Sequence, residues 1–111
     1  MKRSILIFTA GIFAAGAASA GTADVGNPNN PYFMSNGVVL FWTNGARSNV
    51  PACGQGIAQR FAINGATAAG KVQAAALLTA YSLGKKISVI GTGDCQVWSD
   101  TETVNYFQMI D

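Results

Sequence analysis

The first twenty residues have the pattern of a secretory signal peptide, which leaves only a short chain to fold after export. A positively charged start is followed by an almost unbroken apolar run from Ile5 to Ala18, and Ala18–Ser19–Ala20 matches the small-x-small pattern that signal peptidases recognise. The apolar run is shorter than the roughly 20 residues that cross a bilayer, and no stop-transfer charges follow it. We therefore expect a mature protein that begins at Gly21 and has no stable membrane insertion.

The expected mature chain, residues 21–111, is a single domain of 91 residues. A domain of this size buries about 60–65% of the surface of its unfolded chain, so it is marginally stable without a further constraint. Cys53 and Cys95 are its two cysteines, and the oxidising periplasm or cell exterior favours a bridge between them. That bridge would close a loop of 43 residues, worth about 4 kcal/mol in the chain-entropy model. Two free thiols or an intermolecular bridge are the alternatives.

The expected mature chain has no excess of positive charge. Two of the seven Lys and Arg residues belong to the signal, which leaves five basic side chains against five acidic ones. A protein that neutralises several phosphates needs a basic stripe, but here only Lys85 and Lys86 are adjacent cations, a pattern typical of a helix C-terminus. We therefore expect neither nucleic-acid binding nor electrostatic attachment to anionic lipid.

Hydrophobic patterning predicts the order strand, strand, helix, strand, strand after an extended, turn-rich arm. The arm covers residues 21–36, which are rich in Gly, Asn and Pro. The predicted strands are residues 37–43, 58–63, 86–90 and 103–110, and the predicted helix is residues 69–83. This order is typical of the α+β class. We expect a small, mostly antiparallel sheet, or an OB-like barrel, with one helix and one disulfide.

The predicted helix has clear boundary signals and one apolar face. Thr67 can cap its N-terminus with its hydroxyl, and Gly84 suits the left-handed position that follows a helix. The residues spaced at i, i+3, i+4 and i+7 are Ala74, Leu77, Leu78 and Tyr81. We expect this face to pack against the sheet, with Leu77 and Leu78 in the core.

The chain lacks the residue types on which most catalytic sites depend. It contains no histidine, which removes the commonest general base, the commonest metal ligand and the usual partner of a Ser or Cys nucleophile. A Cys53–Cys95 bridge would also remove thiolate catalysis and a thiolate zinc site. Gly91–Thr92–Gly93 follows a predicted strand but does not begin a helix, so it is not a phosphate-binding loop. We predict no catalytic residue and no cofactor.

Three carboxylates, Asp94, Asp100 and Glu102, lie close together in the sequence beside Cys95 and Trp98. They could form an acid/base pair of the glycosidase kind, or offer oxygen ligands to Ca²⁺. The favoured interpretation is structural or ligand-contacting, because Asp residues in turns commonly accept hydrogen bonds from nearby backbone N–H groups. No metal site is predicted.

Trp98 is the better of the two tryptophans for a binding surface, because it lies among Asp, Ser, Thr and Gln residues. Trp42 ends the apolar run Val–Val–Leu–Phe–Trp and is expected to be buried. An aromatic face flanked by carboxylate, amide and hydroxyl groups suits a sugar ring. The predicted ligand-binding residues are therefore Trp98, Asp100 and Asp94.

Several runs of this chain resemble a group of small exported bacterial proteins of uncharacterised function. The resemblance covers Thr43–Arg47, Val50–Cys53, the helix at residues 69–83 and the more specific run Gly91–Val104. In size, export, disulfide and element order, the group is similar to the binding (B) subunits of subtilase-cytotoxin and pertussis-like toxins. That resemblance implies an OB fold, a glycan ligand and a homo-oligomer, a pentamer by analogy. It carries over no individual sugar-contacting residue.

The leading hypothesis is a non-catalytic exported binding module for carbohydrate. The alternative is a structural or interaction protein of the periplasm or envelope without a small ligand, in which the segment Gly91–Val104 fixes the disulfide corner. An enzyme that uses Asp100 and Glu102 is the third interpretation.

The signal pattern predicts that the exported protein starts at Gly21. Intact-mass measurement of the protein recovered from the periplasm or medium should give the mass of residues 21–111 with one disulfide. A retained Met1, or a start well inside the domain, would contradict the assignment.

Overall fold

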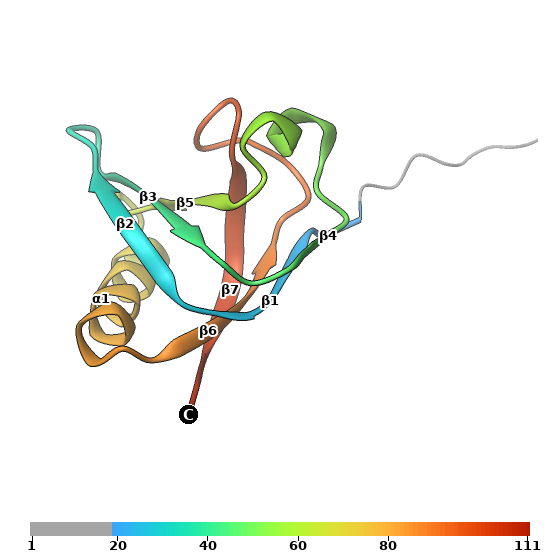
Figure 1. The fold of residues 1–111 in the computed structure, drawn as a ribbon. Helices are drawn as coiled ribbons and strands as arrows, with labels where there is room; N and C mark the ends of the chain where they lie inside the picture. Colours follow the sequence, from blue (N-terminus) through green and yellow to red (C-terminus); the bar gives the residue numbers. More distant parts are fainter. Residues whose placement is uncertain (1–18) are drawn as a thin grey trace, which may run out of the picture.

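The computed structural model describes residues 19–111, so the charged start and apolar run of the predicted signal lie outside the described residues. Within this part the chain forms strands, a 3-10 helix and one α-helix (Figure 1). In chain order these are β1 (Thr22–Gly26), β2 (Pro28–Phe33), β3 (Val38–Thr43), β4 (Arg47–Ser48), the 3-10 helix η2 (Ala52–Ile57), β5 (Arg60–Asn64), α1 (Ala68–Leu83), β6 (Lys86–Gly91) and β7 (Glu102–Ile110).

The strands form one seven-stranded sheet in the order β2-β3-β5-β7-β6-β1-β4. Among these strand pairs only β5–β7 is parallel. The sheet is not closed into a barrel, but Asn27 alone separates β1, which pairs with β6, from β2, which pairs with β3. With β1 and β2 counted as one bent strand, the strand order and the helix between β5 and β6 are those of the partly open OB type. The predicted α+β class, with a small, mostly antiparallel sheet, one helix and one disulfide, is confirmed.

The segment expected to be an extended arm belongs to the sheet. Residues 22–33 form β1 and β2, and the register between β2 and β3 shifts between Asn29 and Tyr32. Pro28 and Pro31 cannot donate a ladder hydrogen bond, and Asn30 has a φ of +49°. These features made the sequence resemble a loop, whereas the chain accommodates them in a bulged edge strand.

The main core lies between the inner face of the curved sheet and α1. Its fully buried aromatic pair, Phe41 of β3 and Phe61 of β5, stacks with ring centroids 6.0 Å apart. The other buried members are Ala23, Val39, Ile63, Leu77, Ala80, Ile87, Val89 and Val104. Every strand from β3 to β7 except the short β4, together with β1 and α1, contributes to this cluster, so the helix joins the two halves of the sheet.

The ends of the helix are confirmed, whereas its predicted buried face is partly wrong. The Thr67 hydroxyl accepts a hydrogen bond from the Gly70 amide at 2.9 Å, and Gly84 is left-handed with a φ of +67°. Leu77 is buried at 1% exposure, but Leu78 is 38% exposed, and Tyr81 is also exposed. The buried face instead contains the small residues Gly70 and Ala80. Because Lys71 is the only charged residue of α1, polarity in the sequence does not fix the helix rotation.

The predicted disulfide is present and joins two loops. Cys53 lies in η2 and Cys95 lies in the loop between β6 and β7 (residues 92–101), with Cα atoms 6.3 Å apart. In Figure 1 η2 and this loop lie together at the end of the domain away from α1. A disulfide indicates a non-cytoplasmic, oxidising compartment. None of the helices that the structure describes is long and apolar enough to span a membrane.

The rotation of α1 predicts different costs for two adjacent leucines. Leu77→Ala should lower the free energy of unfolding by about 2–5 kcal/mol, because it leaves a cavity in the main core. Leu78→Ala, its matched control, should cost less than about 1 kcal/mol because that side chain is partly solvated. Urea denaturation monitored by circular dichroism gives both values. Equal losses would show that the helix packs in a different rotation.

Candidate functional site

A row of aromatic and charged side chains crosses the outer face of the sheet, the face turned away from the main core. We call Tyr32, Trp42, Arg60 and Asp100 the Trp42 row. Tyr32 of β2 and Trp42 of β3 meet edge to face, with ring centroids 5.2 Å apart and planes at 62°. The Arg60 guanidinium carbon of β5 lies 5.4 Å from the Trp42 ring centroid. Asp100 completes the row from the β6–β7 loop.

Strand pairing brings this row together. Trp42 lies opposite Arg60 in the β3–β5 ladder and opposite Asn29 in the β2–β3 ladder. Because side chains alternate along a strand, Trp42 shares the outer face with Val38 and Leu40, while Phe41 points to the main core. Three strands therefore present a continuous polar-aromatic strip.

Asp100 faces Arg60 at the exposed end of the row. Arg60 Nη2 and Asp100 Oδ1 are 2.7 Å apart, and the Asp100 side chain is 63% exposed. Arg60 also donates from Nε to the Thr101 hydroxyl at 2.8 Å, and the same hydroxyl donates to Asp100 at 3.0 Å. The loop is thereby fixed to β5, with one carboxylate oxygen of Asp100 held at the protein surface.

Trp98, the predicted ligand-binding tryptophan, is half-buried. It packs against a second apolar cluster on the outer face, formed by Val38, Leu40 and Ala62, together with Met34 and Val97. The Trp98 carbonyl accepts a hydrogen bond from the Thr101 amide at 3.0 Å, which tightens the loop just before Asp100. The ring therefore supports the loop and contributes only part of its surface to solvent.

Trp42 is not buried as expected; it is partly exposed beside Tyr32, which is 51% exposed. The prediction failed because the apolar run suggested a strand covered on both faces. The β6–β7 loop covers the outer face of β3 only over Val38 and Leu40, and Trp42 lies beyond this cover. From the sequence we expected a buried Trp42 and an exposed Trp98. In the structure both side chains are partly exposed.

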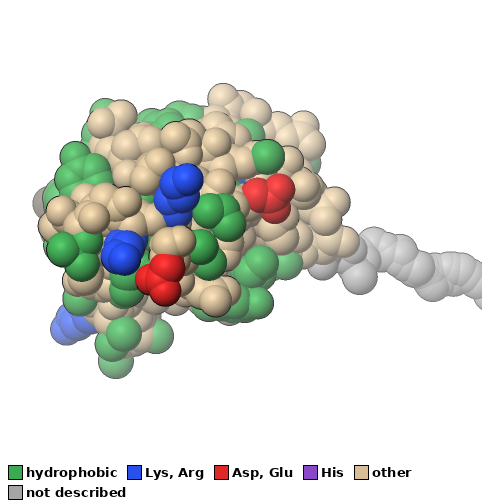
Figure 2. All heavy atoms as spheres, turned by 60° about the horizontal axis from the view of Figure 1, so that its bottom comes forward, with side chains coloured by type: hydrophobic (Ala, Val, Ile, Leu, Met, Phe, Trp, Pro, Cys, Tyr) green, Lys and Arg blue, Asp and Glu red, His purple; other side chains and the backbone are tan. Residues whose placement is uncertain are grey.

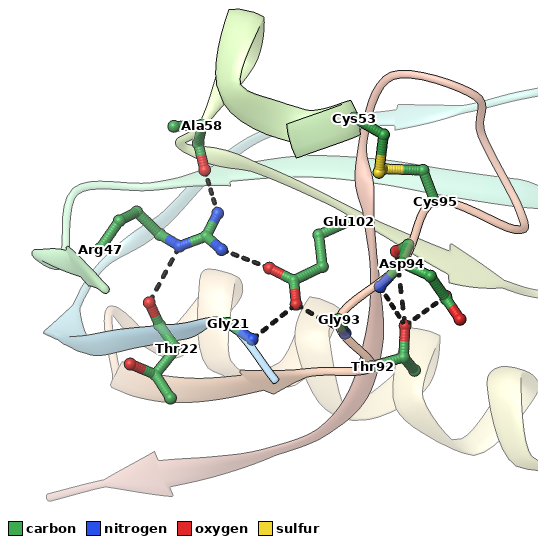
Figure 3. Close-up of polar contacts among 10 residues, drawn as sticks. All are labelled: Gly21, Thr22, Arg47, Cys53, Ala58, Thr92, Gly93, Asp94, Cys95 and Glu102. Carbon is green, nitrogen blue, oxygen red and sulfur yellow. Dashed lines mark hydrogen bonds and ion pairs between the residues drawn. A yellow bond between two sulfur atoms is a disulfide. The ribbon is translucent and has the colours of Figure 1, made fainter. Parts of the chain in front are cut away.

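Asp94 makes its contacts at the other end of the β6–β7 loop. Its carboxylate accepts from the Thr92 hydroxyl at 2.7 Å (Figure 3), and its backbone carbonyl accepts from the Thr103 amide at 3.0 Å. Within the described part of the chain, none of its hydrogen bonds reaches Trp98 or Asp100. The predicted trio is thus divided, with Asp100 in the Trp42 row and Asp94 in the turn next to Cys95.

Glu102, the third carboxylate of the cluster, is completely buried. One of its oxygens pairs with Arg47 Nη2, and the other accepts from the Gly21 and Gly93 amides at 2.8 and 2.9 Å (Figure 3). Arg47 also donates to the Thr22 and Ala58 carbonyls. Burial lowers the pKa of the Arg47 guanidinium from its ordinary value, and the adjacent Glu102 carboxylate opposes this shift.

The three carboxylates therefore have three different partners. Asp100 pairs with Arg60 at the surface, Asp94 bonds Thr92, and Glu102 is sealed inside with Arg47. The glycosidase-like interpretation needs two carboxyl groups that face one reacting bond, and the surface Asp100 and the buried Glu102 do not provide this. Among residues 19–111, no group of three or more His, Cys, Asp or Glu side chains is placed to hold a metal ion.

Sequence reasoning missed Tyr32 and Arg60 as site residues. Tyr32 follows Pro31 in a segment that looked like a loop, and Arg60 appeared only as a polar position in an alternating strand. Their role depends on the register between strands that are distant in sequence, and no local pattern specifies that register. An assumed pairing of the two predicted strands places an Arg opposite a Trp, and that signal could have found Arg60 but not Tyr32.

Comparisons with protein-family models, with curated proteins and with solved structures found no match to this chain.

The packing of Trp98 predicts a structural cost for its removal. Trp98→Ala should lower the free energy of unfolding by about 1–3 kcal/mol, because it uncovers the outer apolar cluster. Asp100→Asn, in the same loop, should cost less than about 1 kcal/mol because its ion pair with Arg60 is exposed to solvent. Urea denaturation of both variants tests this. An unchanged midpoint for Trp98→Ala would mean that its ring does not support the loop.

Proposed function

We propose that the mature chain is a non-catalytic, exported binding module that binds carbohydrate on the Trp42 row. The observation that carries the proposal is the pair of exposed Tyr32 and partly exposed Trp42 beside the Arg60–Asp100 ion pair. In the OB type, the face of the second and third strands and the loops beside it bind oligosaccharides and oligonucleotides. Here those strands are β3 and β5, which carry Trp42 and Arg60.

The row offers the two kinds of contact that a sugar ring needs. The faces of Tyr32 and Trp42 provide rigid apolar area for the C–H side of the ring. At the end of the row, the Asp100 carboxylate accepts hydrogen bonds from sugar hydroxyls, and the Arg60 guanidinium donates to them. The ion pair holds both groups in place before a ligand arrives, which reduces the entropy lost on binding.

The three ligand-binding residues predicted from the sequence have different roles in this proposal. Asp100 is a direct ligand contact. Trp98 supports the loop that carries Asp100 and adds an edge of its ring to the surface. Asp94 lies at the Thr92 end of the loop and would reach only a ligand that extends along it.

Charge favours carbohydrate over an oligonucleotide as the ligand of this face. The only cation in the Trp42 row is Arg60, and Asp100 neutralises it. On the side of the domain shown in Figure 2, which is the bottom of Figure 1 and a different side from the β6–β7 loop, the few basic side chains also form no stripe. Binding of single-stranded nucleic acid combines stacking with a positively charged groove, and the Trp42 row supplies the stacking without the charge.

The resemblance to toxin B subunits extends the proposal to a homo-oligomer, a pentamer by analogy. Weak binding at one site would then be strengthened because several linked sites act at high effective concentration. The competing proposal, an interaction protein without a small ligand, is supported by the exposed apolar residues Phe33, Val72 and Leu83.

The test is a screen on an array of defined oligosaccharides, followed by calorimetry with the best binder. We expect Trp42→Ala and Tyr32→Ala each to weaken binding at least about tenfold, the scale of one lost stacking contact of about 1.4 kcal/mol. Tyr106→Ala is the matched control, because Tyr106 is 56% exposed but lies in the β6–β7 ladder. It should bind like the unmodified protein.

Two results would overturn the carbohydrate assignment. The first is binding of a single-stranded oligothymidylate in preference to every oligosaccharide, which would make the row a nucleic-acid platform. The second is the absence of any oligosaccharide binding by the exported, disulfide-bonded protein at millimolar concentrations, which would favour the interaction protein.

A further inference from the structure

We propose that cleavage after Ala20 creates an ion pair inside the domain, between the new α-ammonium group of Gly21 and the buried carboxylate of Glu102. The Gly21 nitrogen already lies 2.8 Å from Glu102 Oε2, and the Glu102 side chain is fully buried (Figure 3). The proposal uses the expected processing site and is independent of carbohydrate binding.

A backbone hydrogen bond and the absence of side chains at two glycines place the Gly21 nitrogen at the carboxylate. The Gly21 carbonyl accepts a hydrogen bond from the Gly91 amide at 2.7 Å, which extends the β1–β6 pairing by one residue. A Cβ atom at Gly21 would overlap the Glu102 carboxylate, and a Cβ at Gly91 would overlap the same group. Gly21, directly before β1, and Gly91, the last residue of β6, thus leave room for a buried carboxylate and bring the backbone against it.

The bond to be cleaved lies at the boundary between the buried and exposed chain. Gly21 is buried, whereas Ser19 and Ala20 are exposed. Ser19 borders a shallow hollow of about 340 Å³ whose other lining residues are Asn49, Val50, Pro51, Ala52 and Gly93. Removal of the residues before Gly21 therefore leaves its nitrogen facing Glu102 on one side and solvent on the other, where the remaining N–H groups can bond water.

Cleavage changes the charge at this position. A signal peptidase hydrolyses the Ala20–Gly21 amide with one water molecule: the hydroxyl adds to the Ala20 carbonyl carbon, and the nitrogen gains hydrogen. Proton transfer from the new carboxylic acid then yields a carboxylate on the released signal and an ammonium on Gly21. A neutral amide donor of Glu102 becomes a cationic one, which adds a direct attraction between opposite charges to the hydrogen bond that already exists.

The ammonium would be the second cation on a carboxylate that is already removed from water. Arg47 occupies one Glu102 oxygen, and the other accepts from Gly21 and Gly93. A buried charge is costly unless it is paired and hydrogen-bonded, so an additional positive group at this distance stabilises the folded state. The unprocessed chain keeps the Gly21 amide contact but lacks this charge.

The decisive experiment compares a chain that begins at Gly21 with one that begins at Ser19, both disulfide-bonded. The two chains have the same net charge; they differ in the uncharged residues Ser19 and Ala20, which move the terminal ammonium away from Glu102. We expect the Gly21 chain to have a Tm about 4–8 °C higher, the shift that corresponds to about 1 kcal/mol in a domain of this size. In the Glu102→Gln background the difference should disappear. Equal Tm values with Glu102 present would overturn the proposal, as would an undiminished difference in a folded Glu102→Gln protein.

A second measurement does not require the Glu102→Gln variant to fold. The Gly21 chain is acetylated with an amine-reactive reagent, and mass spectrometry follows modification of the α-amine in folded and in urea-unfolded protein. Modification should be at least about tenfold slower in the folded state, because the amine is held at Glu102. The α-amine of the Ser19 chain, which is exposed, should react at similar rates in both states. Equal rates for the Gly21 amine would overturn the ion pair.

Discussion

The buried pair of Arg47 and Glu102 connects more segments of this domain than any other polar contact among the described residues. Glu102 begins β7, and its carboxylate bonds the residue before β1 and the β6–β7 loop. Arg47 in β4 reaches the start of β1 and the residue after η2, and its guanidinium carbon lies 4.3 Å from the centroid of the Phe61 ring. Removal of either partner would leave a buried charge without compensation. The junction of β1, β4, the end of η2 and the β6–β7 loop therefore depends on this pair remaining intact.

The same pair organises the site on the opposite face. Thr101, directly before Glu102, holds Arg60 through its hydroxyl, while the adjacent Asp100 pairs with the guanidinium. Glu102 fixes the start of β7 from the inside, and Thr101 fixes the end of the β6–β7 loop from the outside. The Cys53–Cys95 bridge restrains the beginning of that loop. A loop held at both ends loses little conformational entropy when its exposed carboxylate meets a ligand.

Local patterns predicted the fold class and the helix boundaries, because these depend on residues that are close in sequence. The disulfide was predictable because two cysteines allow a single intramolecular pairing. The rotation of α1 was not predictable: a nearly uncharged helix gives no polar face to distinguish Leu77 from Leu78. β1 and β2 were missed because prolines and an Asn with positive φ mimic a loop, while the pairing that makes them strands comes from β6 and β3. Of the candidate site, Asp100 was found from its loop position, whereas Tyr32 and Arg60 required the strand register.

On the predicted export route, the disulfide and the proposed Gly21–Glu102 ion pair would both form after translocation. The disulfide needs an oxidising compartment, and the Gly21 ammonium exists only once the signal has been removed. Both act on the same corner, since Cys95 and Gly93 belong to the loop that Glu102 bonds. The predicted precursor in the cytoplasm would lack the covalent link and the added charge at once, so its folded state would be less stable than that of the processed protein. Both proposed steps would then raise the stability of the domain in the compartment where the predicted mature chain folds.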